Sequence, residues 1–229
     1  MQFGPPKLVT NNLILCLDAA NLSSYPGSGT TWTDLSGNNN TGTLINGPTF
    51  NGSNGGSIVF NGTNNHVDIT DFSLGNQFTY SFWIKTSTTN LGQIIARGNS
   101  ADNRGVGFYI NNIGAEGKLG ASGNNGSGWN AATISNTIIN DNQWHHVVGV
   151  YNQTTNNCVG YVDGVLGLSA TITMDSNSYT PKNTKIGRNQ YTTVQYYTGN
   201  IALGQIYNTG LTATEILQNY NSTKSRFGL

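Results

Sequence analysis

Apolar and polar residues alternate along several short segments of the chain, and turn-forming residues separate these segments. The clearest alternation runs over residues 78–85, where Phe78, Tyr80, Phe82 and Ile84 fall on one face of an extended chain with a period of two. This pattern predicts a half-buried β-strand. Residues 13–17 are apolar at every position, which predicts a strand that is covered on both faces.

Further segments have the length and the residue types of strands. They are residues 57–60, 66–69, 93–96, 106–110, 118–121, 144–151, 158–163, 184–187 and 199–207. The five residues 61–65 between the first two segments predict a hairpin. Asp163-Gly164 predicts a two-residue hairpin turn, because both residues tolerate a positive φ.

Turn formers dominate residues 19–56, which are therefore expected to form a long loop held to the core by apolar anchors. These anchors are Tyr25, Trp32, Leu35, Leu44, Ile45 and Phe50. One short helix is predicted near the end of the chain. Thr212 and Glu215 form a capping box there, before the apolar face of Ile216, Leu217 and Tyr220.

Composition fits a single all-β domain. The chain has 229 residues, of which 36% are apolar, 10% aromatic and only 9% charged, and its thirty glycines mark many tight turns. A disordered chain would be charged and poor in aromatic residues, so that class is excluded. The expected organisation is an N-terminal arm at residues 1–12, a sandwich domain at 13–220 and a C-terminal tail at 221–229.

Charge and hydropathy disfavour two kinds of partner. Ten basic and ten acidic side chains cancel, and no run of like charge occurs, so nucleic acid and anionic membranes are not expected partners. We expect neither a signal peptide nor a transmembrane segment, because no apolar run has the required length. Cys16 and Cys158 lie in apolar strand patterns and are expected to be buried thiols rather than a disulfide.

Several motifs, taken in order, resemble the laminin-G-like, concanavalin-A-like jelly-roll family. They are residues 58–62 with 66–69, 78–85, 144–151, 161–164, 185–188 and 199–201, continuing to 211–216. The resemblance extends over residues 13–220. It implies an all-β jelly-roll sandwich of two antiparallel sheets, with loops at the rims and a concave face where partners bind.

The two ends of the chain also resemble structural proteins of tailed bacteriophages. Residues 17–21 with 24–32, and residues 219–229, carry this resemblance. It implies a virion component, either a capsid decoration or part of a tail fibre, which has other virion proteins as partners and can form a homo-oligomer. Such a protein is assembled into particles in the host cytoplasm, which agrees with the missing export signal.

Catalytic chemistry is not expected. Glycoside hydrolysis normally needs two carboxyl groups across the scissile bond, and the chain has only the glutamates Glu116 and Glu215, of which Glu215 belongs to the capping box. Signatures of serine hydrolases, phosphate loops and dinucleotide-binding folds do not occur. A non-enzymatic protein is therefore expected, and a glycan-active enzyme is the least favoured alternative.

No cofactor or metal is assigned from the sequence. His145 and His146 are adjacent in a strand and so point to opposite faces, which disfavours a histidine metal site. Calcium stays an open alternative, because loop oxygens are its usual ligands. Its candidate groups are Asp34 with Ser36, Asn38 and Asn40, and Asp102 with Asn99 and Asn103, although Asp and Asn are more often simple turn formers.

Two loops carry the residue types that bind carbohydrate, namely a flat aromatic ring beside amides. The first loop places Trp129 beside Asn124, Asn125 and Asn130, and the second places Tyr191, Tyr196 and Tyr197 near Arg188. The alternative is that Trp129 closes the rim of the core and that the tyrosines cover sheet edges. The expected ligands are surface glycans, bound by a virion protein or by a lectin or carbohydrate-binding module outside a virion.

Overall fold

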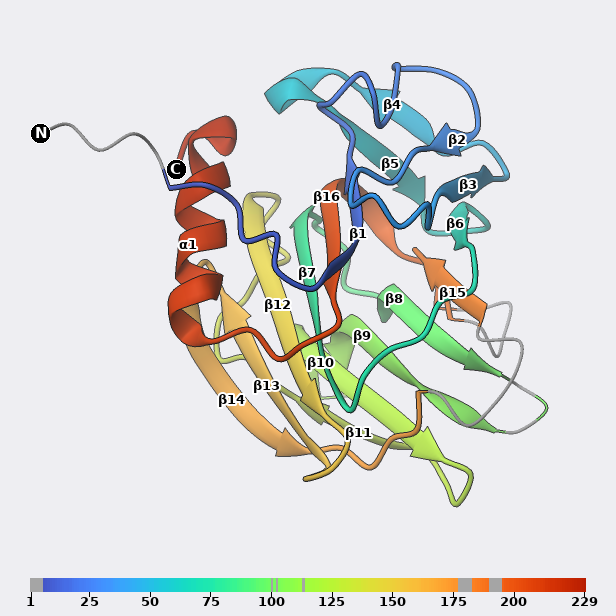
Figure 1. The fold of residues 1–229 in the computed structure, drawn as a ribbon, viewed down its shortest axis with the longest axis vertical. Coiled ribbons are helices and arrows are strands. Elements are labelled where there is room, and N and C mark those ends of the chain that lie inside the picture. Colours follow the sequence, from blue (N-terminus) through green and yellow to red (C-terminus); the bar gives the residue numbers. More distant parts are fainter. Residues whose placement is uncertain (1–5, 100, 102, 113, 177–182, 190–194) are drawn as a thin grey trace, which may run out of the picture.

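A computed structural model describes residues 6–99, 101, 103–112, 114–176, 183–189 and 195–229, whose strands form two antiparallel sheets (Figure 1). In the first sheet the strand order is β14, β13, β12, β7, β16, β5, β4, and β1 also pairs with β16. The bounds of these strands are β1 Leu13–Asp18, β4 Thr49–Asn51, β5 Ser57–Asn61, β7 Gln77–Lys85, β12 Trp144–Asn152, β13 Asn157–Val162, β14 Val165–Thr171 and β16 Thr198–Tyr207.

The second sheet has the strand order β11, β10, β9, β8, β15, β6, β3, β2. Its strands are β2 Thr31–Trp32, β3 Gly42–Ile45, β6 His66–Ile69, β8 Gly92–Asn99, β9 Arg104–Asn112, β10 Ala115–Asn125, β11 Asn130–Thr133 and β15 Asn183–Ile186. The described helices are η1 Ser53–Gly55, α1 Ala213–Thr223 and η2 Lys224–Phe227. The predicted two-sheet antiparallel jelly-roll sandwich with one short C-terminal helix is confirmed.

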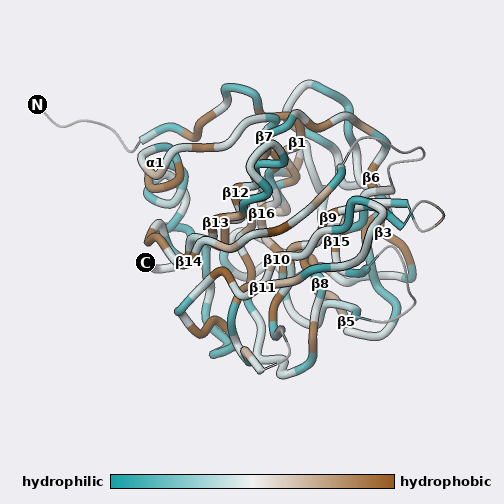
Figure 2. Tube along the Cα trace, turned by 90° about the horizontal axis from the view of Figure 1, so that it is seen from below, coloured by the Kyte–Doolittle hydropathy of each residue, from teal (hydrophilic) through white to brown (hydrophobic). Residues whose placement is uncertain are grey.

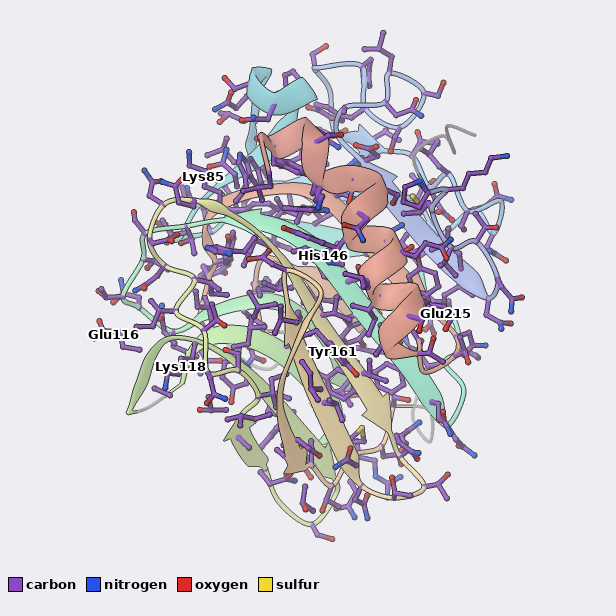
Figure 3. All side chains as sticks on the ribbon, turned by 90° about the vertical axis from the view of Figure 1, so that its left-hand side faces the viewer. Lys85, Glu116, Lys118, His146, Tyr161 and Glu215 are labelled. Atoms are coloured by element: carbon purple, nitrogen blue, oxygen red, sulfur yellow. The ribbon has the colours of Figure 1, made fainter. Side chains whose placement is uncertain are left out.

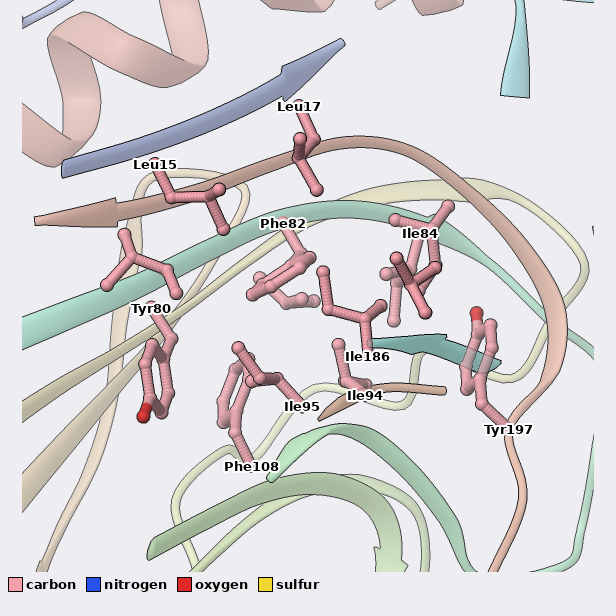
Figure 4. Close-up of a cluster of buried hydrophobic side chains, with 14 of the residues drawn as sticks. Leu15, Leu17, Tyr80, Phe82, Ile84, Ile94, Ile95, Phe108, Ile186 and Tyr197 are labelled. Carbon is pink, nitrogen blue, oxygen red and sulfur yellow. The ribbon is translucent and has the colours of Figure 1, made fainter. Parts of the chain in front are cut away.

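The main core lies between the inner faces of the two sheets. Figure 4 shows Phe82 and Ile84 of the first sheet opposite Ile95 and Phe108 of the second, and all four side chains are fully buried. In Figure 2, hydrophobic stretches surround the labels of β1, β12 and β16, whereas many outer loops are hydrophilic. The predicted apolar face of β7 is therefore the face that packs in the sandwich.

A second apolar layer covers the outer face of the first sheet. Figure 1 shows α1 beside β12, β13 and β14, and Phe227 of η2 stacks on Trp83 of β7 with ring centroids 4.1 Å apart. The prediction that β7 is half-buried is wrong, because Thr79, Ser81 and Trp83 on its other face are also at most 1% exposed. Alternation identifies one apolar face, but a covering helix buries the polar face as well.

Residues at both ends of the described chain pack against this layer. The backbone N–H of Val9 donates to the side chain of Asn219 at 2.8 Å, and Tyr207 donates to the carbonyl of Val9 at 3.0 Å. Arg226 donates to Asp18 at 2.7 Å and to the carbonyl of Gly56 at 2.5 Å. Residues 221–229, expected as a tail, therefore belong to the packed structure.

Two local predictions are wrong for the first third of the chain. Segments 57–60 and 66–69 do not form a hairpin, since β5 pairs with β4 and β16 in the first sheet whereas β6 pairs with β3 and β15 in the second. Asn61 turns the chain between the layers, because its side-chain oxygen accepts the backbone N–H groups of Thr63, Asn64 and Asn65 at 2.9, 3.2 and 3.2 Å.

The expected long loop at residues 19–56 contains β2, β3, β4 and η1. These strands have two to four residues, and their partners come mostly from elsewhere in the chain, so their own sequence carries little strand signal. Of the predicted anchors, Tyr25, Trp32 and Leu44 are buried, but Leu35 and Phe50 remain 37% and 36% exposed.

Three other local predictions are confirmed. Val162 pairs with Val165 across the Asp163-Gly164 turn, whose residues have φ values of 53° and 78°. The capping box of Thr212 and Glu215 starts α1 as expected. Cys16 and Cys158 are free, buried thiols.

Candidate functional site

Trp129 lies in the loop that joins β10 and β11, at one end of the second sheet, where Asn130 pairs with Gly123. Its side chain is 44% exposed, whereas the other three tryptophans of the chain are at most 8% exposed. The indole Nε1 donates to the side-chain oxygen of Asn103, in the turn between β8 and β9, at 3.2 Å. Trp129 is therefore a held, solvent-facing ring and does not close the rim of the core.

The asparagines around Trp129 build this loop. The side-chain oxygen of Asn124 accepts the backbone N–H groups of Gly126 and Gly128 at 2.8 and 3.1 Å, and Asn124 is fully buried. Asn130 donates to the carbonyls of Gly123 and Thr173 at 2.9 Å each and accepts the N–H of Thr173 at 2.9 Å. Both amides therefore hold backbone rather than face solvent.

Asn125 is half-buried, as Asn130 is, and its side-chain oxygen accepts the N–H of Ser127 at 3.2 Å. An ion pair lies beside the same loop, in which Arg104 of β9 and Asp175 are 3.4 Å apart. Arg104 passes close to Gly126, since a Cβ at that glycine would be 3.0 Å from its Nε. Sequence reasoning missed this pair, because Arg104 and Asp175 are 71 positions apart and only the fold brings them together.

The second predicted loop is divided by the structure. Tyr191 lies outside the described residues. Tyr197 is fully buried in the core, where Figure 4 shows it, and its ring packs against Phe60 with centroids 6.0 Å apart. The prediction for Tyr197 is wrong, because a buried ring offers no surface to a ligand. Tyr196 is half-buried, and the guanidinium of Arg188 lies 5.6 Å from its ring centroid.

Tyr196 also approaches a group of charged side chains on β6 and β15. The rings of His66 and Tyr196 have centroids 6.5 Å apart, and His66 Nε2 lies 3.4 Å from Asp68. Lys185 Nζ lies 2.5 Å from the same carboxylate. Partial burial works to raise the pKa of Asp68, but the hydrogen bonds from His66 and Lys185 and their charges outweigh it and lower that pKa to about 2.

The first calcium candidate has the contacts of a turn. Oδ1 of Asp34 accepts the N–H groups of Cys16 and Ser36, and Oδ2 accepts the Ser36 hydroxyl and the N–H of Asn40, at 2.8 to 2.9 Å. Donors therefore surround the carboxylate where a cation would need lone pairs. Asp102 lies outside the described residues, and Asn103 binds Trp129. Within the described ranges, no group of three or more His, Cys, Asp or Glu side chains is arranged so that it could hold a metal ion.

The acidic side chains lie at several places on the molecule, and among the described residues Asp141 and Asp163 meet at one of them, where both contact His145. Figure 3 shows Glu116 and Glu215 far apart, and the backbone N–H of Thr212 donates to the Glu215 carboxylate at 2.8 Å. Six of the seven described aspartates, all except Asp34, contact cations or histidines, in the pairs Asp18–Arg226, Asp68–Lys185, Asp71–Arg97, Asp141–His145, Asp163–His145 and Asp175–Arg104. None of the described helices is long and apolar enough to pass through a lipid bilayer.

The two-layer fold and its lectin-like topology define a jelly-roll domain of the lectin class. Residues 61–217 match the family described as the concanavalin A-like lectin/glucanases superfamily, and the chain belongs to this family. The family resemblance seen in the sequence motifs is therefore confirmed. A search of curated proteins finds no match to the chain.

Solved structures share the fold at low sequence identity. The binding domain of Paraclostridial mosquitocidal protein 1 has a TM-score of 0.68 and 19% identity, over 93% of this chain and 52% of that one. Domain 4 of the extracellular arabinanase AbnA from Geobacillus stearothermophilus, solved with arabinotriose, has a TM-score of 0.68 and 18% identity, over 95% and 100%. The botulinum neurotoxin serotype D binding domain has a TM-score of 0.65 and 18% identity, over 93% and 52%. The chain thus spans about half the length of these toxin domains.

Proposed function

We propose that the protein is a non-catalytic glycan-binding protein and that Trp129 provides the ring against which a sugar lies. The observation that carries the proposal is the exposure of this one tryptophan, with its indole held by Asn103. A flat aromatic ring packs against the apolar face of a sugar, while nearby polar groups bind the hydroxyls. Asn125 and Arg104 are two half-buried polar residues at this loop.

Two facts support a glycan as ligand. The chain belongs to a superfamily of lectins and glucanases. Its fold is also similar to that of an arabinanase domain whose structure was solved in complex with arabinotriose. The finer identity of the sugar depends on the loops, which differ between proteins that share a fold.

The test uses Trp129 as its own reporter. A panel of oligosaccharides is titrated while tryptophan emission is recorded, and bound glycans should change the emission because the other tryptophans are buried. Trp129→Ala removes the reporter, so the affinities of the variants are compared by isothermal titration calorimetry, and Trp129→Ala should bind about tenfold more weakly or worse, as expected when an aromatic anchor is removed. Leu22→Ala, which removes a 78% exposed side chain elsewhere, is the matched control. Unchanged binding by Trp129→Ala would overturn the proposal.

The non-catalytic part of the proposal has its own support and test. The acidic groups described above are dispersed or paired with cations and histidines, and the two glutamates lie apart. Incubation of the protein with the polysaccharides that it binds should release no new reducing ends. Sustained release above that of a Trp129→Ala variant would make the protein a glycan-active enzyme instead.

We further propose that this glycan-binding protein is a structural component of a bacteriophage virion, in a capsid decoration or a tail fibre. The two end segments that resemble phage structural proteins support this role, and they contact each other through Arg226 and Asp18. The partners would be other virion proteins and further copies of this chain. Mass spectrometry of purified particles should detect the protein in stoichiometric amounts, and its absence from particles would refute the virion role.

A further inference from the structure

Five asparagine-glycine pairs occur in the chain, and all five lie within the described residues. In such a pair the backbone nitrogen of the glycine can attack the side-chain amide of the asparagine, because glycine has no Cβ to hinder the approach. The pairs consist of the same two residue types, so their surroundings decide how their reactivities differ. They are Asn46-Gly47, Asn51-Gly52, Asn54-Gly55, Asn61-Gly62 and Asn125-Gly126.

The attack makes three demands on the native structure. Water must reach the pair, no acceptor may hold the N–H of the glycine, and the asparagine amide must be free to turn its plane toward the glycine nitrogen. A donor that points at the amide oxygen favours the attack, because negative charge develops on that oxygen as the new bond forms. The hydrogen bonds around each pair therefore rank the five sites.

Hydrogen bonds oppose the attack in three of the pairs. The Nδ2 of Asn46 donates to the carbonyl of Asn64 at 3.0 Å, and the Nδ2 of Asn61 donates to the side-chain oxygen of Asn64 at 3.0 Å. These bonds must break before either amide can turn. In the third pair the attacking nitrogen is engaged, because the N–H of Gly126 donates to the side-chain oxygen of Asn124 at 2.8 Å.

Asn54 is held at both ends of its amide. Its Nδ2 donates to the carbonyl of Arg226 at 3.3 Å, and its Oδ1 accepts the indole N–H of Trp144 at 3.2 Å. Both partners come from distant parts of the chain, and together they fix the plane of the amide. This pair lies only three residues after Asn51-Gly52, so the two pairs form a matched comparison within one turn.

Asn51-Gly52 meets all of the demands. Both residues are exposed at the end of β4, a three-residue strand at the edge of the first sheet. The backbone N–H of Ser53 donates to the Oδ1 of Asn51 at 2.9 Å, which is the oxygen where charge develops. Among the described residues, no hydrogen bond holds the Nδ2 of Asn51 or the N–H of Gly52. The hydrogen bond that this side chain makes therefore favours the attack.

We propose that Asn51 is a modification site, at which the native protein converts asparagine into aspartate and isoaspartate without an enzyme. The Gly52 nitrogen forms a bond to Cγ of Asn51, and the proton of its N–H ends on the departing amide nitrogen, which leaves as ammonia. Water then opens the cyclic imide at either carbonyl, which gives aspartate or isoaspartate. Both products add a negative charge at the edge of the first sheet, in a chain whose formal net charge is zero.

The test is a time course of the native, full-length chain at mildly alkaline pH, followed by peptide mapping with mass spectrometry. Each converted asparagine gains mass, and fragmentation of the peptide assigns the gain to one site. An Asn51→Asp variant provides the reference for the aspartate product. Asn51 should convert about tenfold faster than any of the other four asparagines, the factor that corresponds to about one hydrogen bond. An equal rate at any of the other four would overturn the proposal.

The urea-unfolded chain separates the effect of the fold from the effect of the local sequence. The hydrogen bonds that rank the sites are lost there, so all five pairs should convert at similar rates. If Asn51 kept its full advantage in the unfolded chain, its neighbours in the sequence would set its rate, and the proposal would be overturned.

A variant locates the attacking nitrogen without disturbing the fold. Gly52→Ala is compatible with the backbone, because Gly52 has a φ of −76° and an added Cβ would lie 3.7 Å from the Phe50 ring. The methyl group should slow the conversion of Asn51 about tenfold, because it keeps the nitrogen from its attack position. Asn46 in the same variant is the internal control, and its rate should not change. An unchanged rate at Asn51 in Gly52→Ala would overturn the proposal.

Discussion

His146 is a buried histidine whose surroundings oppose its protonation. It is 1% exposed, its Nε2 lies 2.9 Å from the Ser81 hydroxyl, and its ring centroid lies 5.4 Å from that of Trp83 and 6.1 Å from that of Tyr220. Burial lowers the pKa of His146 to about 4, against a smaller opposite effect of Asp163. The folded protein therefore binds this proton less readily than the unfolded chain does.

We predict that His146 costs stability in acid. Because its folded pKa lies below 6.5, its value when unfolded, stability is full above that pH and falls as the pH drops toward about 4. The loss reaches about 3 kcal/mol near pH 4. Urea unfolding at a series of pH values should give a flatter profile for His146→Gln than for the wild type. If the free energy of unfolding fell equally steeply with pH in both proteins, His146 would not be the cause of the acid sensitivity.

The neighbouring His145 is predicted to act in the opposite direction. Burial works to lower its pKa, but Asp163 at 2.8 Å and Asp141 at 3.2 Å outweigh burial and raise it. Its stabilisation is therefore complete below the unfolded pKa and disappears as the pH rises through the folded one. In urea unfolding, the advantage of the wild type over His145→Gln should shrink as the pH rises above 6.5, the ordinary pKa of the histidine. If the difference in the free energy of unfolding between the wild type and His145→Gln stayed constant with pH, this expectation would be contradicted.

At the scale of elements, η2 fastens the C-terminal segment to the first sheet. Phe227 is 8% exposed and contacts Trp83 and Trp144, with ring centroids 4.1 and 4.8 Å away. The Trp83 indole also donates to the Thr223 hydroxyl at the end of α1, at 2.8 Å. The helix and the sheet are therefore joined at one aromatic site.

Phe227→Ala should lower the free energy of unfolding by about 3 kcal/mol, the lower part of the range for a buried phenylalanine, since a chain end can relax. Denaturant unfolding monitored by tryptophan emission measures the change. Leu229→Ala, at a 53% exposed position two residues on, is the control and should change stability by less than about 0.5 kcal/mol. A stable Phe227→Ala would mean that η2 does not hold the layer.

At the scale of the molecule, the two cysteines lie in two different layers. Cys16 lies in the outer layer with Trp83 and Phe227, and Cys158 lies in the core between the sheets. Burial, followed by the nearby Asp18 and Asp34, raises the pKa of Cys16 to about 12, and burial also raises that of Cys158. Neither thiol is therefore ionised at neutral pH, and thiolate is the reactive form.

We predict that a thiol reagent modifies neither cysteine of the native protein and both cysteines of the unfolded one. If the layers unfold together, both thiols should become reactive over the same range of denaturant. In Phe227→Ala, Cys16 should react earlier than Cys158, because its cover is loosened. Rapid reaction of Cys158 in the native protein would contradict its place in the core.

Local chemistry accounts for what the sequence alone predicted. The period of two in residues 78–85, the Asp163-Gly164 turn and the Thr212–Glu215 capping box depend on residues close together in the chain. Such signals survive in any fold that contains the element. Trp129 does not belong with them, since its polar Gly-Asn loop fits either an exposed ring or a ring that closes the rim of the core, and its 44% exposure is known only from the structure.

Tertiary structure alone decided which faces are covered and which distant side chains meet. The polar face of β7 is buried because α1 and η2, more than a hundred residues later, lie over it. Tyr197 is in the core and its neighbour Tyr196 is beside Arg188, although their sequence context is the same. Burial and long-range contacts are properties of the assembled layers, because they depend on which strands pair, and one strand's residues do not specify its partner.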